Sequence, residues 1–276
     1  MIILEKAAAL LEKVREQAPL VHNITNYVTV NDCANAVLAI GGSPIMADDI
    51  GEAEDITAIS SALVLNMGTL NQRTIASMLA AGKKANKMGI PVVFDPVGAG
   101  ASALRNDTAK KVLEQVKISI LRGNLSEISF VAGMEASTKG VDSSEKDSKN
   151  DAAAVGRKAA EKFDCVAAVT GAVDVITDGE HVVRISNGHK MLSRVTGTGC
   201  MTSAITGAFA AAAAEGERQD FLAAAAGAVV SMGMAGEIAY KMAGQMGTGS
   251  FHIAIIDALS RLDGAMMKEM GRIDEE

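Results

Sequence analysis

The segment ALVLNMGTLNQRTIASMLAAGKKANKMGIPVVFD (residues 62–95) holds two short apolar runs on either side of a longer segment. The runs, 62–66 and 91–95, have the length and the Val and Leu content of buried strands. The residues between them favour a helix. Parallel strands cannot be joined by a tight turn, so a strand, a helix and a strand in succession predict a parallel pair with a crossover helix.

The same alternation extends in both directions along the chain. Four further runs of strand character lie at 19–23, 43–47, 117–121 and 165–170, with helical segments between most of the runs. Strands that alternate with helices are typical of an α/β fold in which helices cover a sheet. We therefore predict a mainly parallel central sheet.

The last third of the chain departs from this alternation. The stretch VTGAVDVITDGEHVVRIS (169–186) predicts two strands around the turn Asp178-Gly179, hence an antiparallel hairpin near one edge of the sheet. From Gly199 onward the pattern is helical and rich in Ala and Gly. The polar run at 137–150 is expected to be an exposed loop, so residues 1–276 are predicted to form a single domain.

Composition excludes several classes of protein. Hydrophobic residues make up 49% of the 276 residues and charged residues 21%, which is typical of a globular protein. A net charge of −7 gives no general attraction to nucleic acid. The apolar segment 221–236 is shorter than the ~20 residues of a spanning helix, which favours a buried helix. The charged N-terminal segment reads as an amphipathic helix without an export signal, so we expect a cytoplasmic protein with no nucleic acid or membrane partner.

Polar residues and glycines follow every predicted strand of the parallel part. The segments are HNITN, MADD, NMG, DPVGAG, RGNLSE and TG. Ligands of open α/β sheets bind outside the carboxyl ends of the strands, so these residues are expected to converge on one rim. Turns also favour Asn, Asp and Gly, but they do not favour the Arg and the Glu of RGNLSE.

The motif VTGTGC (195–200) stands immediately before a long helical segment. Backbone amides at a helix start can hold an anion, and this would suit the amides of Gly197, Thr198, Gly199 and Cys200. The alternative is an ordinary glycine-rich helix start capped by threonine. No GxxxxGK[ST] motif occurs, which excludes a P-loop nucleotide site.

Two further motifs are expected to place charged side chains at the same rim. Asp95 in DPVGAG would repel a dinucleotide, so a phosphate site assisted by a metal explains it better. In LRGNLSE, Arg122 can clamp a phosphate and Glu127 can meet a hydrated Mg²⁺. Asn124 and Glu127 also have the spacing of a helix capping pair, and both interpretations can hold together.

The first motif, HNITNYVTVNDCANA, is dense in polar groups, of which Asn26 could recognise a small polar ligand. We interpret His22 as a structural histidine. Cys33 and Cys165 are interpreted as small core residues. Met46 stands at a strand end, where it could pack on a ligand.

Seven segments taken in order resemble the hydroxyethylthiazole kinase family over essentially the whole chain. They are VHNITNYVTVNDCANAVLAIGGSPIMADD, LVLNMGTL, VVFDPVGAGAS, LRGNLSEI, AVTGAVDVITDG, VTGTGCM and GTGSFHIAIIDAL. The resemblance implies a three-layer α/β/α ribokinase-like fold and a homotrimer with active sites near subunit interfaces. It also implies ATP-dependent phosphorylation of 4-methyl-5-(2-hydroxyethyl)thiazole.

The resemblance also implies roles for individual residues. Met46 and Gly197 match substrate contacts of the family, and Asn26 matches its thiazole pocket. Arg122 and Thr170 match its ATP contacts.

The acidic residues Asp95 and Glu127 resemble the family's pair associated with Mg²⁺. Thr198 and Gly199 would complete an anion hole for the transferring phosphate. Leu125 and Ala172 depart from the residues usual in the family, without touching the matched positions.

Cys200 stands where many ribokinase-like enzymes have an aspartate base. A thiol with an ordinary pKa of about 8.5 is mostly protonated at neutral pH, although a helix N-terminus lowers that pKa. Our hypothesis is that Cys200 positions the substrate hydroxyl and adds modest base catalysis. Three alternatives remain open: a related kinase acting on a hydroxymethylpyrimidine or pyridoxal, a Cys-dependent hydrolase or acyltransferase with a partner such as His189, and a non-catalytic nucleotide-binding module.

Overall fold

The computed structural model describes residues 2–134, 145–214 and 218–276, and the strands of these residues form a single sheet. The strands are β1 (Leu20–Ile24), β2 (Ser43–Ile45), β3 (Ala62–Asn66), β4 (Val92–Asp95), β5 (Ile120–Asn124), β6 (Val166–Thr170), β7 (Asp174–Thr177), β8 (Val182–Ile185) and β9 (Ile273–Glu275). Their order across the sheet is β2-β1-β3-β4-β5-β6-β7-β8-β9. The prediction that the chain is a single domain stays a prediction.

The parallel part of the sheet confirms the arrangement expected from residues 62–95. Strands β3 and β4 pair in parallel, with Asn66 beside Asp95, and helix α4 (Gln72–Met88) connects them. An Asn71 capping box begins this helix and Gly89, at a φ of 71°, ends it. The parallel pairing continues from β2 through β6, whereas β6 to β9 pair antiparallel, so the predicted hairpin at Asp178-Gly179 is also confirmed.

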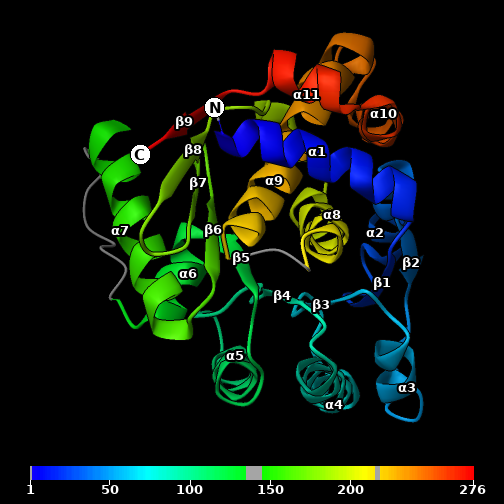
Figure 1. Ribbon diagram of the computed structural model, residues 1–276, viewed down its shortest axis with the longest axis vertical. Coiled ribbons are helices and arrows are strands. Elements are labelled where there is room, and N and C mark those ends of the chain that lie inside the picture. The colour runs from blue at the N-terminus through cyan, green and yellow to red at the C-terminus, as the bar shows by residue number, and fades with distance from the viewer. Residues whose placement is uncertain (1, 135–144, 215–217) are drawn as a thin grey trace.

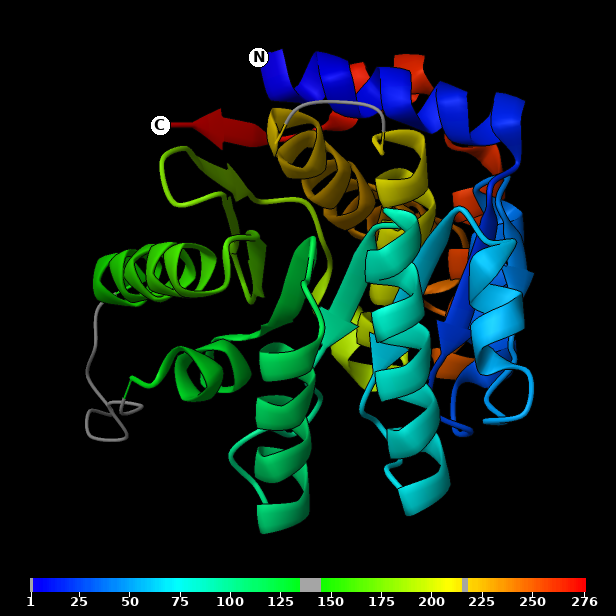
Figure 2. The ribbon, with the colours of Figure 1, turned by 60° about the horizontal axis from the view of Figure 1, so that its bottom comes forward.

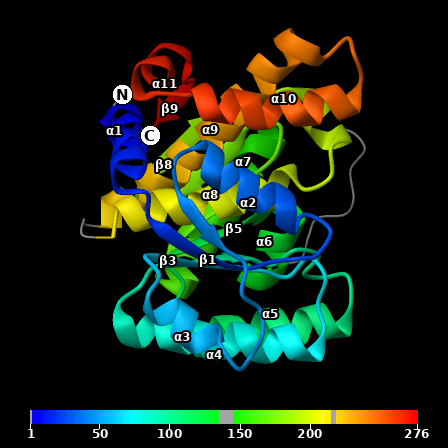
Figure 3. The same ribbon diagram turned by 90° about the vertical axis from the view of Figure 1, so that its right-hand side faces the viewer.

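Helices cover both faces of the sheet, as Figures 1 and 3 show. The remaining helices are α1 (Ile2–Gln17), α2 (Val30–Ala39), α3 (Ala53–Ala58), α5 (Ala103–Gln115), α6 (Leu125–Ala132), α7 (Glu145–Phe163), α8 (Thr198–Ala212), α9 (Arg218–Ala243), α10 (Thr248–Arg261), α11 (Gly264–Met270) and the 3₁₀ helix η1 (Lys190–Arg194).

Two apolar cores fill the space between the sheet and the two helical layers. One contains residues of α1, α2, α8, α9 and α10, packed on side chains such as Val64 and Val93. The other contains residues of α4 to α7, packed on the opposite side chains, such as Leu65 and Phe94. Figure 2 shows α4 and α5 side by side on this second face. Neighbouring residues of a strand point to opposite faces, so the sheet is apolar on both sides and the three-layer α/β/α fold is confirmed.

Three elements differ from the sequence prediction. Strand β5 begins three residues later than expected and runs to Asn124, because β6 pairs with it as far as Thr170. The expected loop at 137–150 is wrong for 145–150, which begin α7, since these residues include no Gly or Pro and contain good helix formers. Residues 137–144 lie outside the described part of the chain.

The third difference is β9, whose three residues at the C-terminus carry no recognisable strand pattern. Pairing with β8 forms this strand, and the carboxylate of Glu275 accepts a hydrogen bond from the backbone amide of Ile3. Contacts with distant parts of the chain therefore decide the conformation here.

Helix α9 is long and apolar enough to span a membrane over Asp220–Ala243, but 83% of the residues in its most apolar window are buried inside the protein. It packs against α1, α8 and α10, and its alanines and glycines allow these helices to approach closely. The prediction of a buried helix at 221–236 is confirmed.

Candidate active site

The carboxyl ends of the parallel strands bring the predicted polar residues to one rim. Asn66 and Asp95 end β3 and β4, while Asn124 and Thr170 pair at the ends of β5 and β6. Helix α8 begins near this rim and packs against β3, β4 and β5 on one face of the sheet. The predicted convergence of these polar residues on one rim is therefore confirmed.

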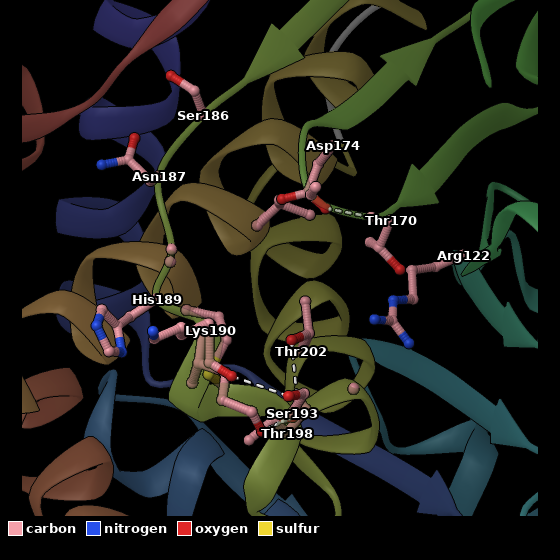
Figure 4. A pocket seen from close by; sticks show the side chains of 18 residues that line it. Arg122, Thr170, Asp174, Ser186, Asn187, His189, Lys190, Ser193, Thr198 and Thr202 are labelled. Atoms are coloured by element: carbon pink, nitrogen blue, oxygen red, sulfur yellow. Dashed lines mark hydrogen bonds between the residues drawn. The ribbon is translucent and has the colours of Figure 1, made fainter. Parts of the chain in front are cut away.

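A cavity of about 610 Å³ opens beside the start of α8. Arg122, Thr170 and Thr198 line it, as Figure 4 shows, and Gly199 lines it as well, so four predicted site residues share one cavity. The segment 186–193 forms the opposite wall and includes Lys190. Its size is suited to a nucleotide-sized ligand, since such pockets are typically ~300–1,000 Å³.

Glycines bring the backbone at the start of α8 close to its neighbours. Gly197, the N-cap, has a φ of 87°, in the left-handed region that favours glycine, and it lies against Thr29. A Cβ on Gly199 would lie 2.9 Å from Nη1 of Arg122, so the absence of a side chain admits the guanidinium. No side chain of the described residues caps this helix, which leaves the amides of its first turn available to an anion.

Asp95 is completely buried between the two helical layers. Its Oδ2 accepts hydrogen bonds from Ser203 Oγ at 2.6 Å and Asn66 Nδ2 at 2.9 Å, and lies 3.5 Å from Nη1 of Arg122. Its Oδ1 is buried and has no hydrogen-bond partner among the described residues. Burial raises the pKa of Asp95 to about 6, against the lowering effects of Arg122, Ser203 and Asn66.

Cys200 lies in the first turn of α8, next to the segment that follows β1. Its Sγ accepts a hydrogen bond of 3.2 Å from Nδ2 of Asn26, whose Oδ1 accepts one from Thr29. Burial raises the pKa of the Cys200 thiol, and the nearby charge of Asp95 raises it further, outweighing the donors around it. The thiol is therefore predominantly protonated at neutral pH, and the helix start does not produce a thiolate.

Glu127 forms the capping box that its spacing with Asn124 predicted. Its Oε2 accepts the amide of Asn124 at 2.9 Å, and the side chain of Asn124 accepts the amide of Glu127. In addition, Oε1 accepts the amide of Gly98 at 2.8 Å. Glu127 thus ties the loop after β4 to the start of α6.

Met46 and Cys200 are partly buried against the apolar core that contains α8, but neither of them lines the large cavity. Met46 lines a separate cavity of about 270 Å³, together with Asn23, Thr25 and Tyr27 from the segment after β1. The predicted ATP residues Arg122 and Thr170 thus share the large cavity. Of the predicted substrate residues, Met46 lines the smaller cavity, whereas Asn26 and Gly197 line neither. Ala172 and Leu125 are the two residues that differ from those usual in the family. Ala172 lines the large cavity, and Leu125, the first residue of α6, packs against the second apolar core.

Neither histidine considered from the sequence is a partner of Cys200 in the described structure. His22 is buried, with Nδ1 2.9 Å from Thr57 Oγ1 and Nε2 2.7 Å from the carbonyl of Ala47, which confirms a structural histidine. His189 stacks on Tyr240, with ring centroids 3.7 Å apart, and has no contact with Cys200 in the described structure. The Cys-dependent hydrolase therefore lacks its proposed base. Cys33 and Cys165 are buried, as predicted.

Sequence reasoning did not single out several residues of the site. Asn66 and Ser203 bind Asp95 directly, and Asp174 and Lys190 line the large cavity. Asn66 could have been predicted as a site residue, because it stands at the end of a strand. Ser203 could not have been predicted, because it lies 108 residues from Asp95 along the chain.

The fold and the glycine-lined site define the class of ribokinase-like proteins. A ribokinase-like superfamily protein from Enterococcus faecalis has the same fold, with a TM-score of 0.56 at 9% identity over 95% of this chain and 83% of that one. A model of the hydroxyethylthiazole kinase family matches residues 11–265. The chain therefore belongs to the hydroxyethylthiazole kinase family.

Two relatives of known name are similar over nearly their full length. A hydroxyethylthiazole kinase of Ruminiclostridium cellulolyticum is 64% identical over 96% of both chains. The solved structure of hydroxyethylthiazole kinase protein from Pyrococcus horikoshii has a TM-score of 0.86 and 39% identity over 98% of both chains. The resemblance inferred from the motifs is confirmed.

Proposed function

We propose that this protein transfers the γ-phosphoryl group of ATP to the hydroxyl of 4-methyl-5-(2-hydroxyethyl)thiazole, in thiamine biosynthesis or salvage. The observation that carries the proposal is the large cavity at the start of α8, where Arg122 and Thr170 face the helix start across one space. Met46 lines a separate, smaller cavity beside the segment after β1. Family membership supports the identity of the two substrates.

Phosphoryl transfer depends mainly on alignment and on neutralising the charge of the transferring group. We assign the amides of Gly197, Thr198, Gly199 and Cys200 to that group, because the positive end of the helix dipole lies there. Arg122 would hold the polyphosphate from the side of β5. The Arg122 side chain is only 13% exposed, so its attraction for phosphate is weakly screened by solvent.

Cys200 is proposed to position the substrate hydroxyl. Its raised pKa argues against a standing thiolate, which phosphate would also repel. The hydrogen bond from Asn26 fixes the thiol, and Asn26 itself is proposed to be part of the thiazole pocket. Gly197 and Met46 would complete the contacts with the thiazole alcohol.

Mg²⁺ is proposed to enter with ATP and to be held by Asp95 and Glu127. The buried, unpartnered Oδ1 of Asp95 fits this role, because an ion would supply the missing partner. Glu127 already accepts two amides, so a water-mediated contact suits it better. The described residues contain no cluster of three or more acidic, His or Cys side chains that could hold a metal ion, so substrate phosphates and water would have to complete the coordination. When bound, the ion would neutralise phosphate charge.

We also propose a homotrimer in the cytoplasm, where ATP is available. Large apolar side chains are exposed on the segment before α2, on α2 and on α10, where another subunit could cover them; they include Tyr27, Val28, Leu38 and Ile253. Tyr27 also lines the smaller cavity. Sedimentation equilibrium would support the trimer by a mass three times that of the chain, and a monomer mass would reject it.

A coupled assay of ADP formation tests the activity. We expect ADP to form with ATP, Mg²⁺ and the thiazole alcohol together, and not when the alcohol is left out. Equal or faster turnover of a hydroxymethylpyrimidine or pyridoxal would instead indicate a related kinase. ATP binding without ADP formation would indicate a non-catalytic module.

A further inference from the structure

A chain of buried hydrogen bonds connects the two sides of the site through Asn66, a residue without an assigned role. Asn26 Nδ2 donates to Cys200 Sγ at 3.2 Å and to Asn66 Oδ1 at 3.0 Å. Asn66 Nδ2 donates to Asp95 Oδ2 at 2.9 Å. Asn66, Asn26 and Asp95 are 2%, 4% and 0% exposed, so water cannot substitute for these bonds.

The orientation of the Asn66 amide is determined by its neighbours. Its Oδ1 accepts from Nδ2 of Asn26 and also from the backbone amide of Gly68, at 2.9 Å. A backbone N–H is a donor only, so the oxygen must face Gly68 and the NH₂ group must face Asp95. A Cβ on Gly68 would approach Asn26 to 2.5 Å, so the glycine allows this contact.

The NH₂ group of Asn66 also determines which oxygen of Asp95 is available. Together with Ser203 and Arg122, it occupies Oδ2. Oδ1 is left buried and without a partner among the described residues. Rotation of the carboxylate would break hydrogen bonds in a site where their loss is costly.

We propose that Asn66 is a positioning residue for phosphoryl transfer. Its amide holds Asp95 with Oδ1 free for the reacting groups, and it holds Asn26 against Cys200. One side chain thereby aligns the carboxylate at the phosphate side with the thiol at the alcohol side. This inference rests on the proposed kinase activity.

Two variants of Asn66 separate its two contacts. Asn66→Ala removes both, whereas the isosteric Asn66→Asp keeps the acceptor for Asn26 and Gly68 but replaces the donor to Asp95 by a carboxylate. We expect kcat to fall roughly 10- to 100-fold in each, because small misplacements of reacting groups have effects of this size. KM for ATP should change by less than about threefold, since Asn66 does not line the large cavity.

A cycle with Asp95→Asn distinguishes positioning from general destabilisation. If Asn66 acts on Asp95 through its NH₂ group, adding Asn66→Asp, which keeps the acceptor for Asn26, to Asp95→Asn should lower kcat by less than about threefold further, because coupled residues are not additive. Asn86→Ala is the matched control. Asn86 exchanges two hydrogen bonds with Lys117, at the opposite end of the sheet, and its loss should leave kcat unchanged.

The outcomes are distinct. Wild-type kcat in Asn66→Asp, or an equally large fall in the Asp95→Asn background, would overturn the proposal. If Asn66→Ala does not fold, Asn66→Asp and its combination with Asp95→Asn decide the question. Absence of kinase activity in the wild-type protein would refute the proposed function instead.

Discussion

Gly197→Ala tests whether the first turn of α8 requires a residue without a side chain. Gly197 has a φ of 87°, and its backbone lies against Thr29. An added Cβ would overlap Cγ2 of Thr29 and would lie 2.9 Å from Cβ of Thr29, closer than van der Waals contact allows. The substitution therefore combines backbone strain with a collision.

The two effects have separate magnitudes. A left-handed conformation costs a residue with a Cβ about 1–2 kcal/mol, and overpacking at a buried contact costs a further ~1–3 kcal/mol. Gly197→Ala should thus lower the free energy of unfolding by roughly 2–5 kcal/mol. Relief of the collision would displace the amides assigned to the phosphate, so kcat should fall by up to ~100-fold.

Gly89→Ala is the matched control, because Gly89 has a φ of 71° but no atom within 4 Å of its Cβ position. It should cost only the strain of about 1–2 kcal/mol and should leave kcat unchanged. Urea unfolding and steady-state kinetics measure both quantities. Adding Thr29→Ser, which removes Cγ2, should restore part of the stability of Gly197→Ala. Equal destabilisation by the two glycine substitutions, with wild-type kcat, would refute the reasoning.

Four further changes test the other parts of the site. Cys200→Ser should retain most of kcat, because a hydroxyl also accepts from Asn26, whereas Cys200→Ala should lower it; equal kcat in both would remove the positioning role. Arg122→Lys should raise KM for ATP at least ~10-fold through loss of the bidentate group, which titration with ATP measures. Glu127→Gln should cost about 1–3 kcal/mol, because the Gln NH₂ must face a backbone N–H; unchanged urea unfolding would contradict this. Burial raises the pKa of Asp174 to about 6, so the stability it contributes is present below about pH 4 and is lost as pH rises through about 6. Asp174→Asn should therefore be more stable than the wild type at pH 7.5, and this gain should disappear toward pH 4; a gain independent of pH would contradict the argument.

Local patterns were sufficient for most of the fold. β3 was predicted to the residue, and β1, β2, β4 and β6 to within two residues at either end, because short apolar runs between helical segments have few alternative structures. The capping box of Asn124 and Glu127 was equally visible, since its partners are three residues apart. β9 was missed because its conformation depends on β8.

The site, like the fold, has a part that neighbouring residues predict and a part that depends on residues far apart in the chain. The rim residues Asp95, Arg122, Thr170 and Gly197 follow from strand ends and a helix start. Their partners do not, since Ser203 and Asn66 reach Asp95 from distant positions in the chain. The sequence indicated a mostly protonated Cys200, but it could not show that burial and the charge of Asp95 raise the pKa of the thiol further.

The sequence by itself determined the order of strands and helices, the family and the residues that gather at the rim. These depend on periodicity and on motifs of a few neighbouring residues. Only the tertiary structure decided that the start of α8 shares a cavity with Arg122 and Thr170, that Asp95 keeps one oxygen without a partner among the described residues, and that Asn66 connects Asp95 to Asn26. Hydrogen bonds and burial depend on distances in space, and residues far apart in the chain acquire those distances only when the sheet and its two helical layers pack together.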